Sequence, residues 1–452
     1  MRYKIVPVLL ITVIFLSSCL RDDVSPTTGE SVTKTDMTLI TIPDATEEST
    51  SEESTMEEYP TPEPEISESA KVWLELKEDP DGVIMTFDEI ASENERVLAD
   101  SDVMTDISLV PDVLSAEEIK AYIAKGHIPR LPKYDTDGSE IGLEHLQRVI
   151  ASMGEDNLPE NVTPMRGIVS SRANLRSIPD NKPYRKAPSD PYDTIQQTEL
   201  HVATPVWVIC ESTDGEYLLV RSSNYVGWVK TECIAVTDSA EKWSDFAFPE
   251  SFVCVTDSSV KLDITELDMG VVLPLVSEDR EGFSVKLPVR GEDASLGETE
   301  IRLTRDSAVK GYLDFTYENF ISQAFKYEGI MYSWGGLDTG VDCSGFVGNV
   351  LRTFGFRLPR DTKDQQTVVG KSVDVRGKSH GEIADILDRI EGPTAVYYPG
   401  HVLFYLGRSA EDGKYYFIHA PQIGEAVSVT SKTSLVGMTY VCEFTSAEEG
   451  DL

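Results

Sequence analysis

The chain has 452 residues, which is too long for a single hydrophobic core, so several domains are expected. It carries 78 Asp and Glu residues against 40 Lys and Arg, a formal net charge of −38. Contact with a phosphate backbone needs clustered Lys and Arg, so this balance argues against a nucleic-acid partner. No spacing of Cys and His resembles a zinc site, and we expect neither a metal nor another cofactor.

The first 19 residues are predicted to be an export signal. A basic start with Arg2 and Lys4 is followed by an apolar run over residues 6–16, which is too short to span a bilayer comfortably. The run ends in Leu16-Ser17-Ser18-Cys19, which resembles the lipobox of bacterial lipoproteins. This resemblance implies that Cys19 is lipidated and anchors the protein to the bacterial membrane, outside the cytoplasm. An ordinary signal peptide that happens to contain a cysteine is the alternative.

Two segments without visible chemistry follow. Residues 20–70 are rich in Glu, Ser, Thr and Pro and hold too little apolar surface to fold, so we expect a disordered acidic tether. Residues 71–162 have helical patterns with capping-box starts at Thr86 and Ser115, and we expect a helical segment that clasps the rest of the chain.

Short strands are predicted over residues 163–237 and again over 248–316. In the first unit, Asp214-Gly215 separates two apolar runs and predicts a hairpin. The second unit repeats the pattern, and both resemble bacterial SH3-like barrels. Cys210 and Cys233 fall in the same barrel and could pair in an exported protein, but the sequence leaves this open.

A Gly-rich loop over residues 332–342 ends at Cys343, where an apolar, helix-like run begins. The start of a helix presents unpaired N–H groups and a partial positive charge, which favour the nucleophilic thiolate of a cysteine placed there. The alternative is a buried structural cysteine. We favour the nucleophile, because the loop, the cysteine and the start of the helix coincide.

Two histidines flank a predicted hairpin downstream of this cysteine. His401 begins one apolar run and His419 ends the next, with Asp412-Gly413 as the turn between them. Adjacent antiparallel strands would place one imidazole against Cys343 and the other behind the first. This is the arrangement of nucleophile, base and orienting residue, although a single histidine of this kind would more often be structural.

Several motifs together resemble the NlpC/P60 family of papain-like cysteine peptidases, which cleave bacterial cell-wall peptides. The matching segments are Tyr332-x-Trp334-Gly335-Gly336, Asp342-Cys343-Ser344-Gly345-Phe346, Leu358-Pro359-Arg360-Asp361-Thr362, Gly400-His401-Val402 and His419-Ala420. The resemblance implies an α+β catalytic domain over residues 317–447. The chain is therefore expected to be multidomain, with two SH3-like β-barrels, this papain-like domain and the helical N-terminal segment.

The family's roles carry over to matching positions. Cys343 would be the nucleophile, His401 the base, His419 the residue that orients it, and Tyr332 a group beside the oxyanion. Residues expected to contact the substrate are Asp342, Ser344, Trp334, Arg360, Asp361 and Thr362. One stretch departs from the family pattern, since residues 392–398 replace the usual Gly-Asp-Leu-like entry to the strand of the base.

The resemblance also implies a substrate. It indicates cleavage of peptidoglycan peptides between γ-D-glutamate and a diamino acid, meso-diaminopimelate or L-lysine, by a monomer. The subgroup with two SH3-like barrels implies a preference for a free N-terminal L-alanine, and implies that the first barrel walls one side of the groove. For Asp361 two interpretations compete: a helix N-cap, or a counter-charge for the amine of that alanine.

Two other functions stay open at this point. A wall-binding lipoprotein without catalysis would use only the barrels, but it would be expected to have lost Cys343, His401 or His419. A papain-like acyltransferase would use the same thioester with an amine acceptor, and no acceptor pocket is evident from the sequence.

Overall fold

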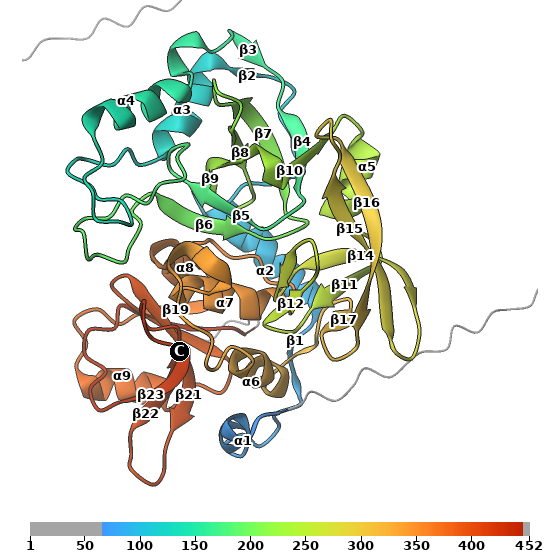
Figure 1. Ribbon diagram of the computed structural model, residues 1–452. Coiled ribbons are helices and arrows are strands. Elements are labelled where there is room, and N and C mark those ends of the chain that lie inside the picture. Colours follow the sequence, from blue (N-terminus) through green and yellow to red (C-terminus); the bar gives the residue numbers. More distant parts are fainter. Residues whose placement is uncertain (1–65, 446–452) are drawn as a thin grey trace, which may run out of the picture. The chain divides into compact units, whose positions relative to one another are not determined.

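The computed structural model describes residues 66–445, and the expectations for Cys19, the export signal and most of the tether lie outside them. The elements are labelled in Figure 1. Within the described range, no helix is both long and apolar enough to cross a bilayer.

The N-terminal helices divide between two hydrophobic cores. Helices α1 (Glu68–Leu74) and α2 (Phe87–Asp100) bury Trp73 and Ile90 in the core of the C-terminal domain. Strand β1 (Val83–Met85) pairs with β18 (Phe315–Thr316), which directly precedes that domain. Helices α3 (Ala116–Lys125) and α4 (Leu143–Ser152) pack instead on the first barrel, as do the short β2 (Leu114–Ser115), η1 (Glu155–Asn157) and β3 (Asn161–Val162) around them. The N-terminal segment therefore packs on both the C-terminal domain and the first barrel.

The local signals of these helices are found as predicted. Thr86 and Ser115 each accept a hydrogen bond from the backbone of a glutamate three residues on, whose carboxylate accepts one in return. Gly126 ends α3 in an extended conformation with φ −68°, not in the left-handed one that a C-terminal glycine usually adopts.

The first barrel is built on a seven-stranded sheet in the order β10-β4-β7-β8-β9-β5-β6. Its strands are β4 (Met165–Val169), β5 (Ala173–Arg176), β6 (Gln196–Leu200), β7 (Pro205–Glu211), β8 (Tyr217–Arg221), β9 (Val226–Lys230) and β10 (Ile234–Thr237), with η2 (Thr231–Cys233) before the last. Gly215 occupies the β7–β8 turn with φ +76°, as the Asp-Gly signal predicts.

The second strand-rich unit follows α5 (Ala240–Ala247). It contains a five-stranded sheet in the order β16-β15-β14-β11-β17 and a two-stranded ribbon. The strands are β11 (Phe252–Val255), β12 (Ser259–Lys261), β13 (Glu266–Asp268), β14 (Val272–Glu278), β15 (Gly282–Arg290), β16 (Leu296–Thr304) and β17 (Ala308–Lys310).

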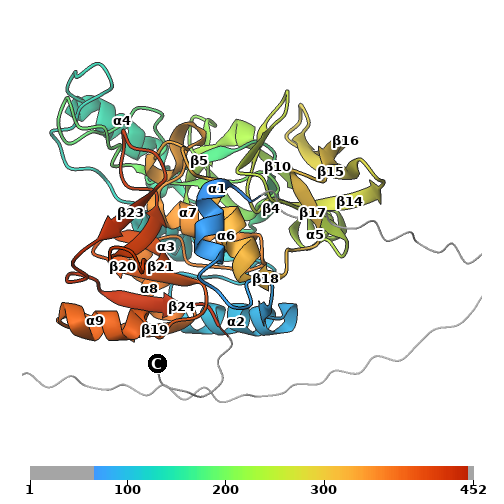
Figure 2. The same cartoon turned by 90° about the horizontal axis from the view of Figure 1, so that it is seen from below.

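The C-terminal domain, from α6 onward, has helices on both faces of an antiparallel sheet. The helices are α6 (Tyr317–Phe325), η3 (Trp334–Thr339), α7 (Cys343–Arg352), α8 (Thr362–Val368) and α9 (His380–Leu387). The strands are β19 (Lys371–Asp374), β20 (Thr394–Tyr398), β21 (His401–Arg408), β22 (Tyr415–His419), β23 (Ser428–Lys432) and β24 (Tyr440–Glu443), in the order β19-β24-β20-β21-β22-β23. Figure 2 shows α9 on one face and α6 with α7 on the other. Phe320 and Phe346 each meet Phe404 edge-on across the inner core, which fixes α7 against β21.

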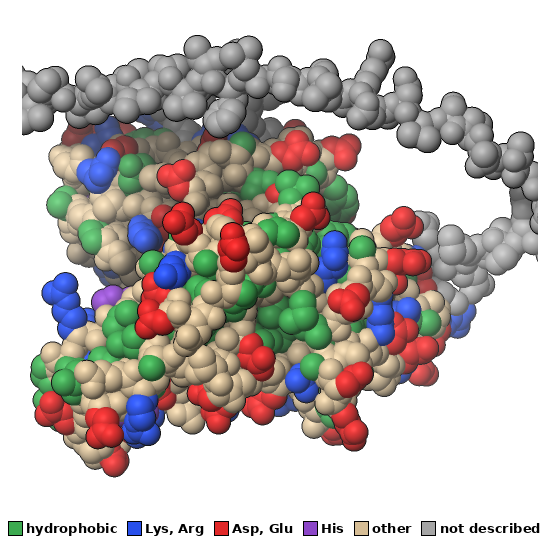
Figure 3. All heavy atoms as spheres, turned by 90° about the horizontal axis from the view of Figure 1, so that it is seen from above, with side chains coloured by type: hydrophobic (Ala, Val, Ile, Leu, Met, Phe, Trp, Pro, Cys, Tyr) green, Lys and Arg blue, Asp and Glu red, His purple; other side chains and the backbone are tan. Residues whose placement is uncertain are grey.

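The face of the molecule that Figure 3 shows is mixed in charge. On the face shown in Figure 3, Asp and Glu side chains are scattered, and Lys and Arg do not gather into one patch. Cys210 and Cys233 are both free, so the disulfide that the sequence left open is not formed.

Candidate active site

Cys343 is the first residue of α7, as the sequence predicts. Asp342 caps the helix by accepting a hydrogen bond from the N–H of Gly345 at 2.8 Å. Cys343 is only 6% exposed, and the backbone N–H groups of Ser344 and Val402 act to lower the pKa of its thiol. Burial, together with the Asp342 carboxylate, nevertheless raises the pKa of Cys343 to about 12. The resting group is therefore a neutral thiol, not the thiolate expected from the start of the helix alone.

The two histidines meet at the ends of neighbouring strands. His401 begins β21 and His419 ends β22, and Nε2 of His401 lies 2.8 Å from Nδ1 of His419. Burial lowers the pKa of His401 to about 4 and that of His419 to about 3. Both rings are neutral at pH 7, so one nitrogen of the pair donates and the other accepts. When His401 donates from Nε2, its Nδ1 carries the lone pair that a general base needs.

The β21 strand also brings His401 to the nucleophile. Helix α7 packs on β21, and one of the backbone groups that lower the pKa of Cys343 belongs to Val402, the residue after His401. The structure thus unites Cys343, His401 and His419. Tyr332 joins them: it is buried at 8% exposure, and after burial itself the charges of Asp342 and Cys343 contribute to raising the pKa of its hydroxyl.

Arg360 ties this site to the first barrel. Its guanidinium contacts both oxygens of Asp342, at 2.8 and 3.1 Å, and donates to the hydroxyl of Ser344 at 2.8 Å. The same group donates to the hydroxyl of Thr198 at 2.6 Å and to Glu199 at 3.3 Å, both on β6. We expected Asp342, Ser344 and Arg360 to contact substrate. The structure instead buries them together, and their polar atoms bind one another.

The Gly-Gly turn needs glycine because β6 lies against it. Gly335 and Gly336 have φ of +58° and +70°, and a Cβ on Gly336 would lie 2.1 Å from a carboxylate oxygen of Glu199. The N–H of Gly335 donates to Asp342 at 3.1 Å, and its carbonyl accepts from Gln196 at 3.0 Å. The loop before the nucleophile is therefore shaped jointly by α7 and by the first barrel.

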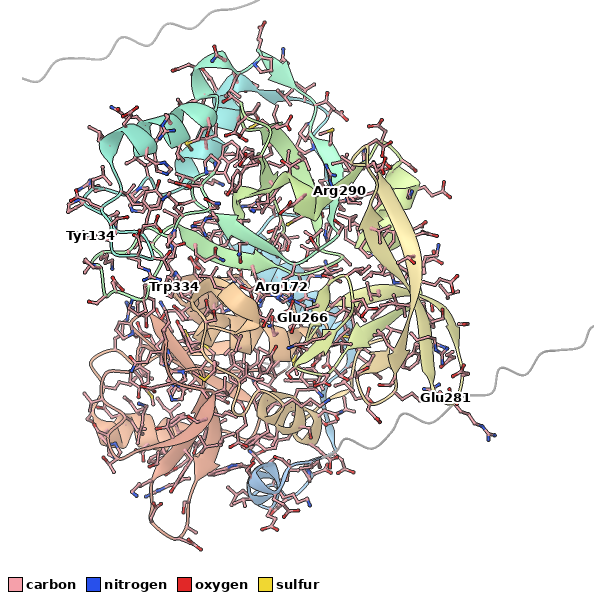
Figure 4. All side chains as sticks on the ribbon, viewed as in Figure 1. Tyr134, Arg172, Glu266, Glu281, Arg290 and Trp334 are labelled. Atoms are coloured by element: carbon pink, nitrogen blue, oxygen red, sulfur yellow. The ribbon has the colours of Figure 1, made fainter. Side chains whose placement is uncertain are left out.

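Trp334 stands at the same boundary and stays partly accessible. Its indole N–H donates to the carbonyl of Gln196 at 3.2 Å, and its ring meets Tyr192 edge-on at 5.4 Å. It is 38% exposed, so part of its surface remains free for a ligand. Figure 4 labels Trp334 where the catalytic domain adjoins the first barrel.

Asp361 occupies the N-cap position of α8, but its side chain makes no cap hydrogen bond. Its side chain is 36% exposed, and burial raises the pKa of the carboxyl while Arg360 and Lys363 oppose that rise. Its ion-pair partner is the exposed Lys363, with Nζ 4.0 Å from Oδ2, so the carboxylate keeps capacity to bind another group. Thr362 beside it begins the helix and is half-buried.

The first barrel places Tyr225 next to Asp361, a residue that sequence reasoning did not single out. After burial, the Asp361 charge is the largest contribution that raises the pKa of Tyr225, and the Tyr225 hydroxyl donates to Gln197 at 3.1 Å. Its only signal is its position just before the Gly227-Trp228 strand. Which tyrosine of the barrel approaches α8 depends on tertiary packing.

Comparisons with known proteins agree with this geometry. The model of the NlpC/P60 family matches residues 329–444, and a model of an SH3 domain of the SH3b1 type matches residues 181–230. A γ-D-glutamyl-L-lysine dipeptidyl-peptidase of Bacillus subtilis (strain 168) is 26% identical over 258 residues, which cover 55% of this chain and 80% of that protein. A protein of the same name from Bacillus cereus is 28% identical over 252 residues, covering 52% and 69%.

The fold has a solved counterpart. The structure of an NlpC/P60 endopeptidase from Photobacterium damselae subsp. piscicida superposes with a TM-score of 0.65 at 19% identity, covering 86% of this chain and all of that one. At this identity the likeness concerns the fold alone. The predicted fold class, with SH3-like and NlpC/P60 domains, is confirmed.

Proposed function

This chain is an NlpC/P60 cysteine peptidase joined to an SH3b domain, and from this premise we propose that it cleaves peptidoglycan peptides between γ-D-glutamate and the diamino acid. One observation carries the proposal: Cys343 begins α7 beside Val402, and the preceding His401 is hydrogen-bonded to His419. The names of the two Bacillus relatives support the γ-D-glutamyl bond.

Because the Cys343 thiol and the His401 imidazole are both neutral at rest, the first proton transfer runs from the sulfur to the ring. As the sulfur of Cys343 attacks the γ-carbonyl of D-glutamate, its proton passes to Nδ1 of His401, and the carbonyl oxygen becomes an oxyanion. Backbone N–H groups at the start of α7 and the Tyr332 hydroxyl are placed to stabilise that charge. His401 then protonates the leaving amine and a thioester remains. Water, deprotonated by His401, hydrolyses the thioester to the free acid and restores the thiol.

The first experiment is the product test. The protein should convert L-Ala-γ-D-Glu-diamino-acid peptides to L-Ala-D-Glu and the free diamino acid, which mass spectrometry identifies. Peptides still attached to the wall sugar should react slowly. Cleavage at another bond would contradict the proposal.

Asp361 supports the preference for a free amino terminus. Its carboxylate does not cap α8, lies beside Tyr225, and shares the loop with Arg360, which is engaged elsewhere. The ammonium group of L-alanine could bind the Asp361 carboxylate, which is partly shielded from water. A charge-assisted hydrogen bond of this kind contributes about 1.5–3 kcal/mol, or roughly tenfold to a hundredfold in selectivity.

We therefore expect Asp361→Asn to lower kcat/KM by about tenfold to a hundredfold for free-amine peptides and to change it little for N-acetylated ones. The matched control is Asp364→Asn, in the first turn of the same helix, which should leave both rates unchanged. Equal losses of Asp361→Asn on both substrates would show that the carboxylate does not select the amine.

We also propose that the protein is anchored outside the cytoplasm through acyl chains on Cys19. The support is the sequence Leu16-Ser17-Ser18-Cys19 at the end of the apolar run. Metabolic labelling with a fatty acid should mark the wild-type protein and Cys233→Ser, but not Cys19→Ser. An unlabelled wild-type protein, secreted with residues beyond Cys19 at its amino terminus, would refute anchoring.

A further inference from the structure

Lys432 acts on the candidate base through its side chain, because its backbone pairs with Tyr415, at the opposite end of β22 from His419. It is the last residue of β23, and its Nζ is 5.1 Å from the centroid of the Tyr398 ring. Tyr398 in turn faces His401 directly in the β20–β21 pairing. The nearness has an electrostatic consequence, since the Lys432 charge contributes to lowering the pKa of both His401 and His419.

The ammonium has no anionic partner in the part of the chain that the structure describes. Neighbouring basic residues of the same sheet are paired: Lys414 with Asp412 at 2.8 Å, and Arg408 with Asp388 at 2.9 Å. Within residues 66–445, its Nζ lies over the face of the Tyr398 ring, in a chain of net charge −38. The Tyr398 hydroxyl beneath it is buried and has no hydrogen-bond partner among the described residues. Within the described part of the chain, the Lys432 ammonium therefore has no anionic partner and the Tyr398 hydroxyl no hydrogen-bond partner.

The chemistry fixes which half of the substrate lies near Lys432. His401 must protonate the amine that leaves, so the diamino acid lies next to His401 when the bond breaks. The acyl half occupies the other side of Cys343, toward Asp361 and the first barrel. Because Tyr398 pairs with His401, a charge over the Tyr398 ring would lie nearer the leaving half than the acyl half.

We propose that Lys432 binds a carboxylate of the diamino acid that leaves, and that it selects meso-diaminopimelate over L-lysine where the bound carboxylate is that of the side chain. The inference rests on the proposed function and deepens it. The carboxylate has two sources: the side-chain carboxylate of meso-diaminopimelate, or the α-carboxylate of a diamino acid that ends the peptide. The side chain of L-lysine carries only an ammonium group, which Lys432 would repel.

The test compares L-Ala-γ-D-Glu tripeptides that differ only in the third residue. The third residues are meso-diaminopimelate, its side-chain amide, its α-amide, and L-lysine. For the wild type we expect kcat/KM to fall about tenfold when the contacted carboxylate is amidated, as for the loss of one charge-assisted contact. Loss on side-chain amidation and with L-lysine identifies the side chain as the source, whereas loss on α-amidation identifies the α-carboxylate.

Two variants separate binding from an effect on the histidines. Lys432→Gln should erase the difference between the acid and its amide, and Lys414→Gln, from the same sheet, should preserve it. The proposal is overturned if the wild type cleaves all four peptides equally, or if Lys432→Gln slows all four by one common factor. Hydrolysis of none of them would refute the proposed function itself, so the two failures can be told apart.

Discussion

Cys343→Ala should reduce hydrolysis of L-Ala-γ-D-Glu-diamino-acid peptides to the uncatalysed rate while the protein stays folded. The variant removes the only atom that can form the thioester, and the site around it is held by Asp342 and Arg360, not by the sulfur. His401→Ala should lower kcat by about 10²–10⁴-fold, the usual contribution of a positioned base. Rates are measured by release of L-Ala-D-Glu, and folding by circular dichroism.

Two further histidine variants test whether the loss of activity is specific to His401. His419→Ala should cost less than His401→Ala, because His419 only orients the ring of His401 through their 2.8 Å contact. His380→Ala, at the start of α9 in the same domain, should leave the rate unchanged. Full activity of Cys343→Ala would refute the mechanism.

A separate experiment distinguishes hydrolysis from acyl transfer. An amine acceptor is added and the products are identified by mass: hydrolysis gives the free acid, and acyl transfer gives a new amide.

The parts of the fold and of the site that the sequence predicts are those that depend on residues close together in the chain. The capping boxes at Thr86 and Ser115, the turn at Asp412-Gly413 and the Cys343 helix start each depend on residues within a few positions. The two histidines could be paired because a hairpin brings its strand ends together. For the same reason, the sequence alone is enough to predict the roles of Cys343 as nucleophile, His401 as base and His419 as orienting residue.

Contacts between the first barrel and the C-terminal domain could not be predicted from local sequence signals. Glu199 and Arg360 are 161 residues apart, and no pattern near either residue indicates the other. Arg360 therefore looked like a substrate-binding arginine in a motif loop, although its partners are Asp342, Ser344 and the first barrel. The thiolate expectation failed for a related reason: the helix start is local, but the depth of burial that raises the pKa of Cys343 follows from the whole fold.

Replacing Arg360 should have the largest effect on stability. Arg360→Met keeps much of the side-chain volume but leaves Asp342 and Glu199 buried without their cation, and both carboxylate side chains are under 10% exposed. Removing one partner of such a buried group costs about 3–5 kcal/mol in the free energy of unfolding. Denaturation in urea measures this loss. The control is Arg376→Met, whose exposed pair with Asp374 should contribute nothing measurable.

Arg360→Lys distinguishes geometry from charge. Lysine keeps the cation but cannot reach Asp342, Thr198 and Glu199 together with one ammonium group. We expect a smaller loss of stability than for Arg360→Met, but a clear loss of kcat, because the Gly335 turn and the start of α7 depend on Asp342. A kcat equal to the wild type would show that the link to the barrel does not position the site.

The pH dependence of the Arg360→Met penalty tests whether the link is electrostatic. Burial alone would raise the pKa of Glu199, but Arg360, His201 and Arg172 together hold it below its usual value. In the wild type this carboxylate therefore stabilises the fold above about pH 4.3, the ordinary pKa of glutamate, and that contribution is lost as the pH falls further. Without Arg360 the pKa of Glu199 rises, so its ionised carboxylate contributes less to stability. The difference in unfolding free energy between the two proteins should therefore shrink as the pH falls below about 4.3, whereas a difference that stays constant would mean that Arg360 acts through packing alone.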